Sequence, residues 1–183
     1  MASTKAKRPS ATAPDISIVV PVMNEQGNIK PLITAILEAF KGRNIEIMYV
    51  DDASTDNTAK ELLEMKAITP QLRVLTHIQR SGQSAALRSG IIAATAPLIG
   101  TLDGDGQNLP EDLVHLEEQV LAHRPGLVMA AGVRVNRIDG AAKRYASIFA
   151  RKIRRWILND DHPDTGCATK VFDRELFLKL PYF

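Results

Sequence analysis

The stretch "IGTLDGDGQNLPEDL" (residues 99–113) decides the fold, because an apolar run stops abruptly there at two carboxylates. Asp103, Asp105 and Gln107 follow at every second position, with glycine at 104 and 106. An apolar run that ends in Asp-Gly is typical of a buried strand that reaches the surface in a tight turn. These polar side chains would therefore lie at the end of a strand, where they either form a simple turn or bind a ligand.

Similar apolar runs recur along the chain and alternate with segments of helical periodicity. The runs are rich in β-branched residues and cover residues 16–22, 45–51, 72–78, 97–103 and 126–133. Helical stripes cover residues 28–41, 54–68, 82–95 and 110–123, the second with Ser54 or Asp56 as its cap. This alternation predicts an α/β/α sandwich with a mostly parallel central sheet.

Length and composition are consistent with one soluble globular domain. The chain has 183 residues, enough for a single core, and we expect a disordered polar tail over 1–14 and one domain over 15–183. The single cysteine, Cys167, excludes an internal disulfide and a cysteine-based metal site. No apolar run approaches the roughly 20 residues of a membrane-spanning helix.

Acidic and amide side chains follow three of the predicted strands. Asn24 and Glu25 come after the first, Asp51 and Asp52 end the second, and the Asp103 stretch ends the fourth. Because the carboxyl ends of parallel strands share one edge of a sheet, these groups are expected to converge on a ligand site. Carboxylate and amide oxygens are hard ligands, so the cofactor expected there is Mg²⁺ or Mn²⁺. The four histidines show no metal-ligand spacing and are interpreted as structural.

Five motifs in register resemble those of a known enzyme family. They are "VVPVMNEQGNI", "VDDASTDNT", "SGQSAALRSG", "LDGDGQNLPEDL" and "DTGCATKVF". Together they resemble family 2 glycosyltransferases of the GT-A type, in the branch of dolichol-phosphate mannose synthase and the undecaprenyl-phosphate sugar transferases. The resemblance spans about residues 15–175 and implies a Rossmann-like GT-A fold and a nucleotide-sugar donor, either a UDP- or a GDP-sugar.

The resemblance also implies roles for individual residues on the donor side. Asp52 would reach the base, Gly82 would lie beside the nucleoside, and Asp103 would face the ribose and the metal. The nucleotide pocket would be completed by Pro21, Val22, Asn24 and Glu25. The metal ligands would be Asp103, Asp105 and Gln107, with Asp105 counted as catalytic because it holds the ion on the diphosphate.

On the acceptor side the resemblance implies a lipid phosphate, such as dolichyl or undecaprenyl phosphate. Arg134 matches an arginine that handles donor or acceptor phosphate, and Arg144 and Ser147 match a pair near the acceptor phosphate, one residue closer in spacing than in some relatives. An ionised phosphate can attack the sugar without a protein base and invert the anomeric centre. A hydroxyl acceptor would need a base instead, for which Asp164 is the candidate.

The segment 141–158 combines an apolar stripe containing Trp156 with a basic face. Residues 134–155 hold 8 basic residues against one acid, whereas residues 9–133 hold 9 against 15. This pattern favours peripheral contact with an anionic membrane, at its cytoplasmic face, over an ordinary core-packed helix. No nucleic-acid-binding module accompanies the charge, so no nucleic-acid partner is expected, and the sequence leaves self-association open.

Two other classes of protein share part of this pattern. A phosphoacceptor signalling domain could use Asp51, Asp52 and Asp103 to bind Mg²⁺, although such domains need no Asp105–Gln107 extension. A non-catalytic nucleotide-sugar-binding remnant is the second, because relatives continue into further acceptor-side segments and a membrane anchor beyond the final "LPYF".

Overall fold

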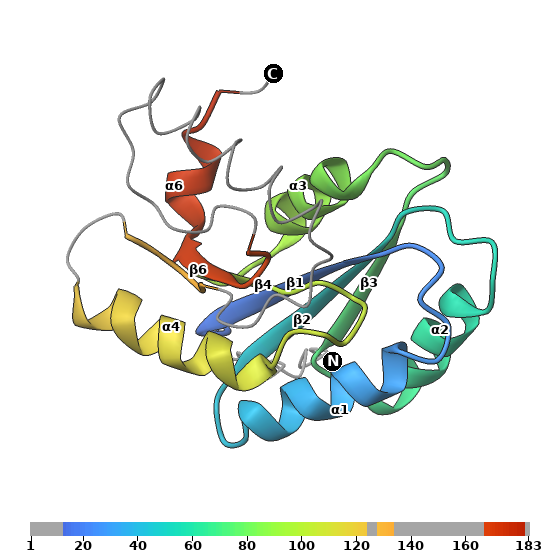
Figure 1. Ribbon diagram of the computed structural model, residues 1–183, viewed down its shortest axis with the longest axis horizontal. Coiled ribbons are helices and arrows are strands. Elements are labelled where there is room, and N and C mark those ends of the chain that lie inside the picture. The colour runs from blue at the N-terminus through green and yellow to red at the C-terminus, as the bar shows by residue number, and fades with distance from the viewer. Residues whose placement is uncertain (1–12, 124–127, 134–166, 182–183) are drawn as a thin grey trace, which may run out of the picture.

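The computed structural model describes residues 13–123, 128–133 and 167–181, which form a six-stranded sheet with helices on both faces (Figure 1). The strand order is β3-β2-β1-β4-β6-β5. The strands are β1 (Ile16–Val22), β2 (Ile45–Asp51), β3 (Leu72–Thr76), β4 (Leu98–Thr101), β5 (Met129–Ala131) and β6 (Lys170–Asp173). The predicted α/β sandwich with a mostly parallel sheet is confirmed.

The centre of the sheet is parallel and covered on both faces. β1 pairs in parallel with β2 and β4, and β2 pairs in parallel with β3. Every residue of β1 and β2 is buried, which explains why their sequences read as nearly continuous apolar runs rather than as alternating ones. The carboxyl ends of β1, β2 and β4 therefore meet at one edge of the sheet, as the sequence predicts.

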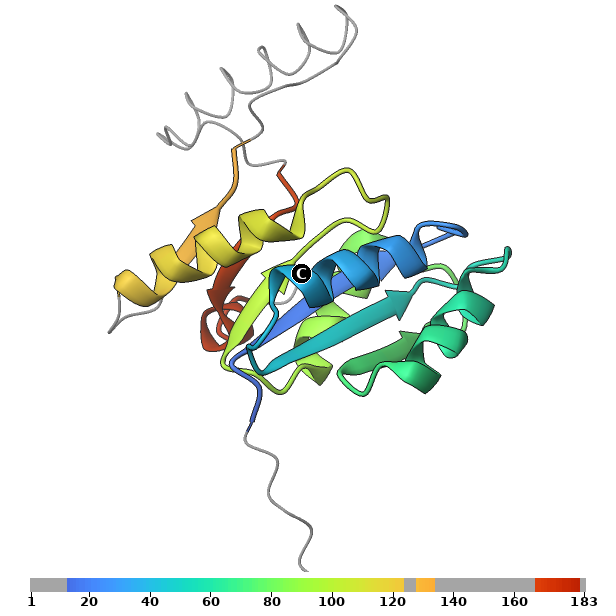
Figure 2. The same cartoon turned by 90° about the horizontal axis from the view of Figure 1, so that it is seen from below.

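The helices form two layers, which Figures 1 and 2 show from perpendicular directions. They are α1 (Ile29–Ala39), α2 (Thr58–Ile68), α3 (Gln83–Ala93), α4 (Pro110–Ala122) and α6 (Arg174–Leu178). One core cluster joins α1, α2 and α4 to the face of the sheet that carries Ile18 and Tyr49. A second cluster joins α3 and α6 to the face that carries Val19 and Met48. Each strand side chain faces one layer or the other because successive residues alternate across the sheet.

The far side of the sheet departs from the sequence prediction. β6 lies between β4 and β5 and pairs antiparallel with both, whereas the sequence pattern indicates no strand there. A four-residue strand is too short to show a period, and its place depends on two strands distant in sequence. The helix α2 begins at Thr58, with Asn57 at the cap position. Of the two predicted caps, Asp56 accepts the N–H of Thr58 at 2.9 Å, whereas the Ser54 hydroxyl accepts the backbone N–H of Asn24 at 2.9 Å.

Some predicted segments lie outside the described residues. They include most of the tail 1–14 and the basic segment 141–158. Within the part of the chain that the structure describes, none of the helices combines the length and the apolar character needed to cross a bilayer.

Candidate functional site

A cavity of about 340 Å³ lies at the carboxyl edge of β1, β2 and β4, and we call it the rim cavity. Its lining comes from the end of β1, from the segments that follow β1, β2 and β4, and from the loop between β3 and α3 with the start of α3. It includes seven residues that the sequence places in the site: Pro21, Val22, Glu25, Asp52, Gly82, Asp103 and Asp105. Four of the predicted acidic side chains, Glu25, Asp52, Asp103 and Asp105, thus share one cavity at the edge where ligands of open α/β sheets bind.

The segment after β1 is held in place by side chains of the segment after β2. Four consecutive backbone N–H groups, of residues 24–27, donate to side chains between Ser54 and Glu61 over 2.8–3.1 Å. In return, the side chain of Asn24 accepts the N–H of Thr55 at 2.8 Å. Asn24 therefore ties the two loops together and is not among the residues that line the rim cavity. Its left-handed backbone (φ +58°) suits asparagine better than most side chains.

Asp52 holds the loop between β3 and α3. Its carboxylate accepts the N–H of Ser81 at 2.8 Å and of Gly82 at 2.7 Å, and it contacts Nδ1 of His77 at 2.7 Å. An ionised carboxylate only accepts hydrogen bonds, so Nδ1 donates to Asp52, and Nε2 is hydrogen-bonded to the Ser89 hydroxyl at 2.9 Å. Burial raises the pKa of Asp52, but the bonds from His77, Ser81 and Gly82 outweigh it, and the pKa lies below its ordinary value.

The hydrogen bond to Asp52 explains why a glycine occupies position 82. Its φ of +90° is a conformation that side chains with a Cβ rarely adopt, and it places the Gly82 N–H on Asp52 at the start of α3. The position is therefore more than a loop glycine, because it shapes the wall of the rim cavity. His77, interpreted from sequence as structural, contacts a cavity residue directly, and only its distance from Asp52 in the fold reveals this.

The Asp103–Gln107 stretch turns away from β4 directly against the end of β1. A Cβ on Gly104 would lie 2.4 Å from Val22 Cγ1 and 3.1 Å from the Pro21 carbonyl oxygen, so only glycine fits there. Asp103 accepts a bond from the Gln83 amide at 2.8 Å. Asp105 is exposed and accepts the backbone N–H of Gln107 at 3.0 Å. The Gln107 side chain is exposed and lies outside the cavity lining.

The donor set of the rim cavity suits a hard divalent cation. Among the described residues, no group of three or more His, Cys, Asp or Glu side chains forms a complete metal site. Mg²⁺ and Mn²⁺ commonly bind through one or two carboxylates, with substrate phosphates supplying further ligands. Asp103 and Asp105 provide such a pair on one wall, so the residues present fit an ion that arrives with a phosphorylated ligand.

The lining also contains residues that sequence reasoning did not assign: Met23, Arg80, Gln83 and Ala86. Arg80 is the cationic side chain among the described lining residues, against four carboxylates. In the sequence, only their position on either side of Gly82 places Arg80 and Gln83 close to the cavity. Spacing along a loop does not determine the direction of a side chain, so their part in the lining could not be predicted. The predicted acceptor residues Arg134, Arg144, Ser147 and Asp164 lie outside the described residues.

The position of Asp51 argues against the phosphoacceptor signalling domain considered above. Its side chain is buried and accepts the N–H of Ser54 at 2.9 Å, within its own loop. It does not line the rim cavity. The geometry therefore does not bring Asp51, Asp52 and Asp103 together as one acidic site.

Comparison with known families shows which family the chain belongs to. The family described as Glycosyl transferase family 2 matches residues 17–180. The chain belongs to this family. The resemblance carried by the five sequence motifs is thus confirmed at the level of the family.

Curated relatives of this family 2 glycosyltransferase act on polyprenyl phosphates, according to their names. The chain is 32% identical over 171 residues to dodecaprenyl-phosphate galacturonate synthase of Rhizobium johnstonii, covering 86% of this chain and 47% of the relative. It is 32% identical over 165 residues to undecaprenyl-phosphate 4-deoxy-4-formamido-L-arabinose transferase of Shewanella sediminis, covering 88% and 49%. The chain therefore spans about half the length of these relatives.

Solved structures share the fold. A Pyrobaculum calidifontis mannosyltransferase in complex with GDP-Man and Mn²⁺ is 22% identical, with a TM-score of 0.68, and covers 94% of this chain and 48% of its own. Glucosyl-3-phosphoglycerate synthase of Mycobacterium tuberculosis, in complex with UDP, is 22% identical, with a TM-score of 0.70, and covers 97% and 66%. These likenesses establish the GT-A fold of this family 2 glycosyltransferase.

Proposed function

We propose that this family 2 glycosyltransferase moves a sugar from a nucleoside diphosphate donor to the phosphate of a polyprenyl phosphate, with a divalent cation and with inversion. The observation that carries the proposal is the rim cavity, where Asp52, Asp103 and Asp105 lie on one lining. The polyprenyl phosphate acceptor is supported by the names of the curated relatives. Such an acceptor would be met at a membrane surface.

The nucleoside end of the donor would lie against Asp52. A carboxylate has about four acceptor positions, and His77, Ser81 and Gly82 use three of those on Asp52. One position remains to accept an N–H of the base. Uracil and guanine both present a ring N–H, so this contact suits either base.

The diphosphate end would lie beside Asp103 and Asp105. Four carboxylates against Arg80 give the described lining a net negative charge, which would repel a diphosphate unless a cation lay between them. Asp103 and Asp105 would hold Mg²⁺ or Mn²⁺, which when bound offsets the charge that develops on the leaving diphosphate. Gln107 remains a predicted ligand.

The acceptor supplies its own nucleophile in this scheme. A phosphate monoester is largely ionised at neutral pH, since its second pKa is about 6. Its oxygen forms the new bond to the anomeric carbon, and the bond to the diphosphate breaks with its electron pair on the nucleotide. Arg134, Arg144 and Ser147 remain the predicted groups for the acceptor phosphate, and Asp164 the predicted base for a hydroxyl acceptor.

Thermal-shift measurements with UDP- and GDP-sugars, each with and without Mn²⁺, test the donor half. One of these donors is expected to raise the melting temperature in a metal-dependent way, and Asp105→Ala is expected to abolish that dependence. Glu64→Ala, an exposed carboxylate on α2, is the matched control and should behave as wild type. Absence of a shift with every nucleotide sugar would contradict the proposal.

A further inference from the structure

A second cavity of about 570 Å³, which we call the side cavity, adjoins the rim cavity on the face of the sheet covered by α3 and α6. Gln83 and Asp103 line both cavities. Its volume is within the roughly 300–1,000 Å³ of small-molecule sites. Its apolar wall is formed by Leu87, Ile91, Phe172, Leu176, Phe177 and Leu180.

The apolar wall has a fixed base and an exposed edge. Ile91 and Phe172 are buried in the core between α3 and the sheet, and Phe172 stacks on Phe177 with ring centroids 6.1 Å apart. Leu180, at the edge, is 58% exposed. The base is therefore held by the fold, while the edge presents apolar surface that a ligand could cover.

The end of the side cavity next to the rim cavity is polar. The Gln83 amide donates to Asp103 at 2.8 Å, so the two shared residues are joined to each other. Lys170, which pairs in β6 with Thr101 of β4, also lines the side cavity. Its ammonium donates to the Cys167 carbonyl, and because an ammonium has three donors it can also bind an anion.

We propose that the side cavity binds the first isoprene units of the polyprenyl phosphate acceptor, with the phosphate at the Gln83–Asp103 end near Lys170. The apolar wall leads to Lys170 and to Asp103, whose charge the divalent cation of the proposed function would offset, and this matches an amphipathic ligand with one anionic end. Continuity with the rim cavity through Gln83 and Asp103 then brings the acceptor phosphate to the sugar. This inference rests on the proposed function and names the acceptor side of the same site.

Two leucines of the same C-terminal segment provide the test. Leu180 lines the side cavity, whereas Leu178 is similarly exposed (48%) and is not among its lining residues. Binding of geranyl phosphate to the full chain is measured by calorimetry for wild type, Leu180→Glu and Leu178→Glu. Leu180→Glu is expected to weaken binding at least about tenfold, because it places a charge on apolar ligand surface. Leu178→Glu should stay within about twofold of wild type.

Partial ligands separate the apolar and anionic contributions. Geraniol and inorganic phosphate should each bind more weakly than geranyl phosphate, and Lys170→Met should weaken geranyl phosphate but not geraniol. Melting temperatures and nucleotide-sugar binding of all three variants establish that they fold and retain the rim cavity.

Three outcomes would overturn the inference. They are equal effects of the two leucine variants, phosphate alone binding as tightly as geranyl phosphate, or no binding of geranyl phosphate by a chain that still binds its nucleotide sugar. The last outcome leaves the donor half of the proposed function intact. Failure of the nucleotide-sugar thermal shift, by contrast, counts against the proposed function itself.

Discussion

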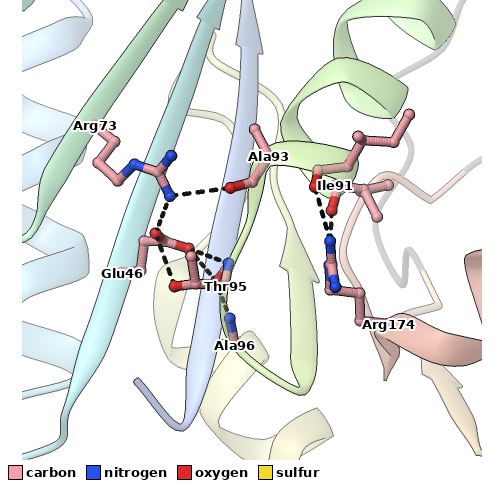
Figure 3. A network of polar contacts seen from close by, with 9 residues as sticks. Glu46, Arg73, Ile91, Ala93, Thr95, Ala96 and Arg174 are labelled. Atoms are coloured by element: carbon pink, nitrogen blue, oxygen red, sulfur yellow. Dashed lines mark hydrogen bonds and ion pairs between the residues drawn. The ribbon is translucent and has the colours of Figure 1, made fainter. Parts of the chain in front are cut away.

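Glu46 and Asp52 lie at opposite ends of β2, and both are buried carboxylates, 6% and 3% exposed. Glu46 accepts the Ser17 hydroxyl from β1 and both the N–H and the hydroxyl of Thr95 from the segment before β4, and it pairs with Arg73 of β3 (Figure 3). Asp52 accepts from a loop and a histidine and lines the rim cavity. One carboxylate therefore joins strands, and the other joins two loops at the rim cavity.

The two environments lower both pKa values for related reasons. Burial raises the pKa of Glu46, and the bonds from Ser17 and Thr95 and the charge of Arg73 more than offset it. The same balance between burial and hydrogen bonds holds for Asp52. The difference is that the Glu46 partners come from three strands or strand connections, whereas the Asp52 partners come from the β3–α3 loop and the residue after β3, and Asp52 lines the rim cavity. A lowered pKa alone thus does not distinguish a structural from a functional carboxylate.

The largest expected effect is on stability, from Glu46→Ala. The variant leaves the buried Ser17 hydroxyl and the Thr95 N–H without their acceptor and removes the charge that faces Arg73. We expect a loss of about 3 kcal/mol in the free energy of unfolding, measured by urea denaturation. Exposed Glu64→Ala should change it by less than about 0.5 kcal/mol. A similarly small change for Glu46→Ala would contradict a stabilising role of Glu46 in the sheet.

Asp52→Asn is expected to affect binding more than stability. The amide cannot accept from both Ser81 and Gly82 as the carboxylate does, so the wall of the rim cavity shifts. We expect nucleotide-sugar affinity to fall at least about tenfold, with a loss of about 1–2 kcal/mol in unfolding free energy, measured by titration and urea denaturation. Unchanged affinity together with a large loss of stability would show that Asp52, like Glu46, has a structural role.

The pH dependence of the unfolding free energy tests the environment of Glu46 with a variant, Glu46→Gln, that keeps the shape of the side chain. Because the pKa of Glu46 is lower in the folded chain, the unfolded chain binds more protons below about pH 4.5, so stability should fall as pH falls through that range. Glu46→Gln removes this contribution and should flatten the slope of unfolding free energy between pH 3 and 6. Asp52 acts in the same direction, and Glu117, whose pKa burial raises, acts in the opposite one. An unchanged slope in Glu46→Gln would contradict the assignment.

The smallest expected effect concerns the joint between the loops after β1 and β2, by which we mean the hydrogen bonds that connect them. The buried Thr58 hydroxyl accepts the N–H of Glu25, a cavity residue, at 2.8 Å. Thr58→Val keeps the shape but leaves that N–H without its acceptor, at a cost of about 1 kcal/mol and a few-fold loss of nucleotide-sugar affinity. Thr34→Val is the matched control, because Thr34 is exposed and its hydroxyl only bonds Lys30 within α1. Equal affinities of the two variants would show that the joint does not position the cavity.

Short-range patterns explain which features could be predicted. Five of the six described strands coincide with predicted apolar runs, although β3, β4 and β5 are shorter than predicted. β1, β2 and β4 are buried on both faces, which requires such runs, whereas β3 and β5 are partly exposed. The convergence of Glu25, Asp52, Asp103 and Asp105 followed from the rule that parallel strands end at one edge. β6 was missed, because antiparallel insertion between β4 and β5 depends on pairing partners that lie far away in the sequence.

The sequence by itself determined the fold class, the edge of the sheet that holds the candidate site, and the family, since apolar period and motif order are local properties of the chain. Only the tertiary structure decided the partners of each carboxylate. Glu46 meets Arg73 and Thr95, Asp52 meets Ser81 and Gly82, and Asp103 meets Gln83, each across 20 to 49 residues. Hydrogen bonds of this range depend on how strands and helices pack, and the same packing made Gln83 a residue of two cavities.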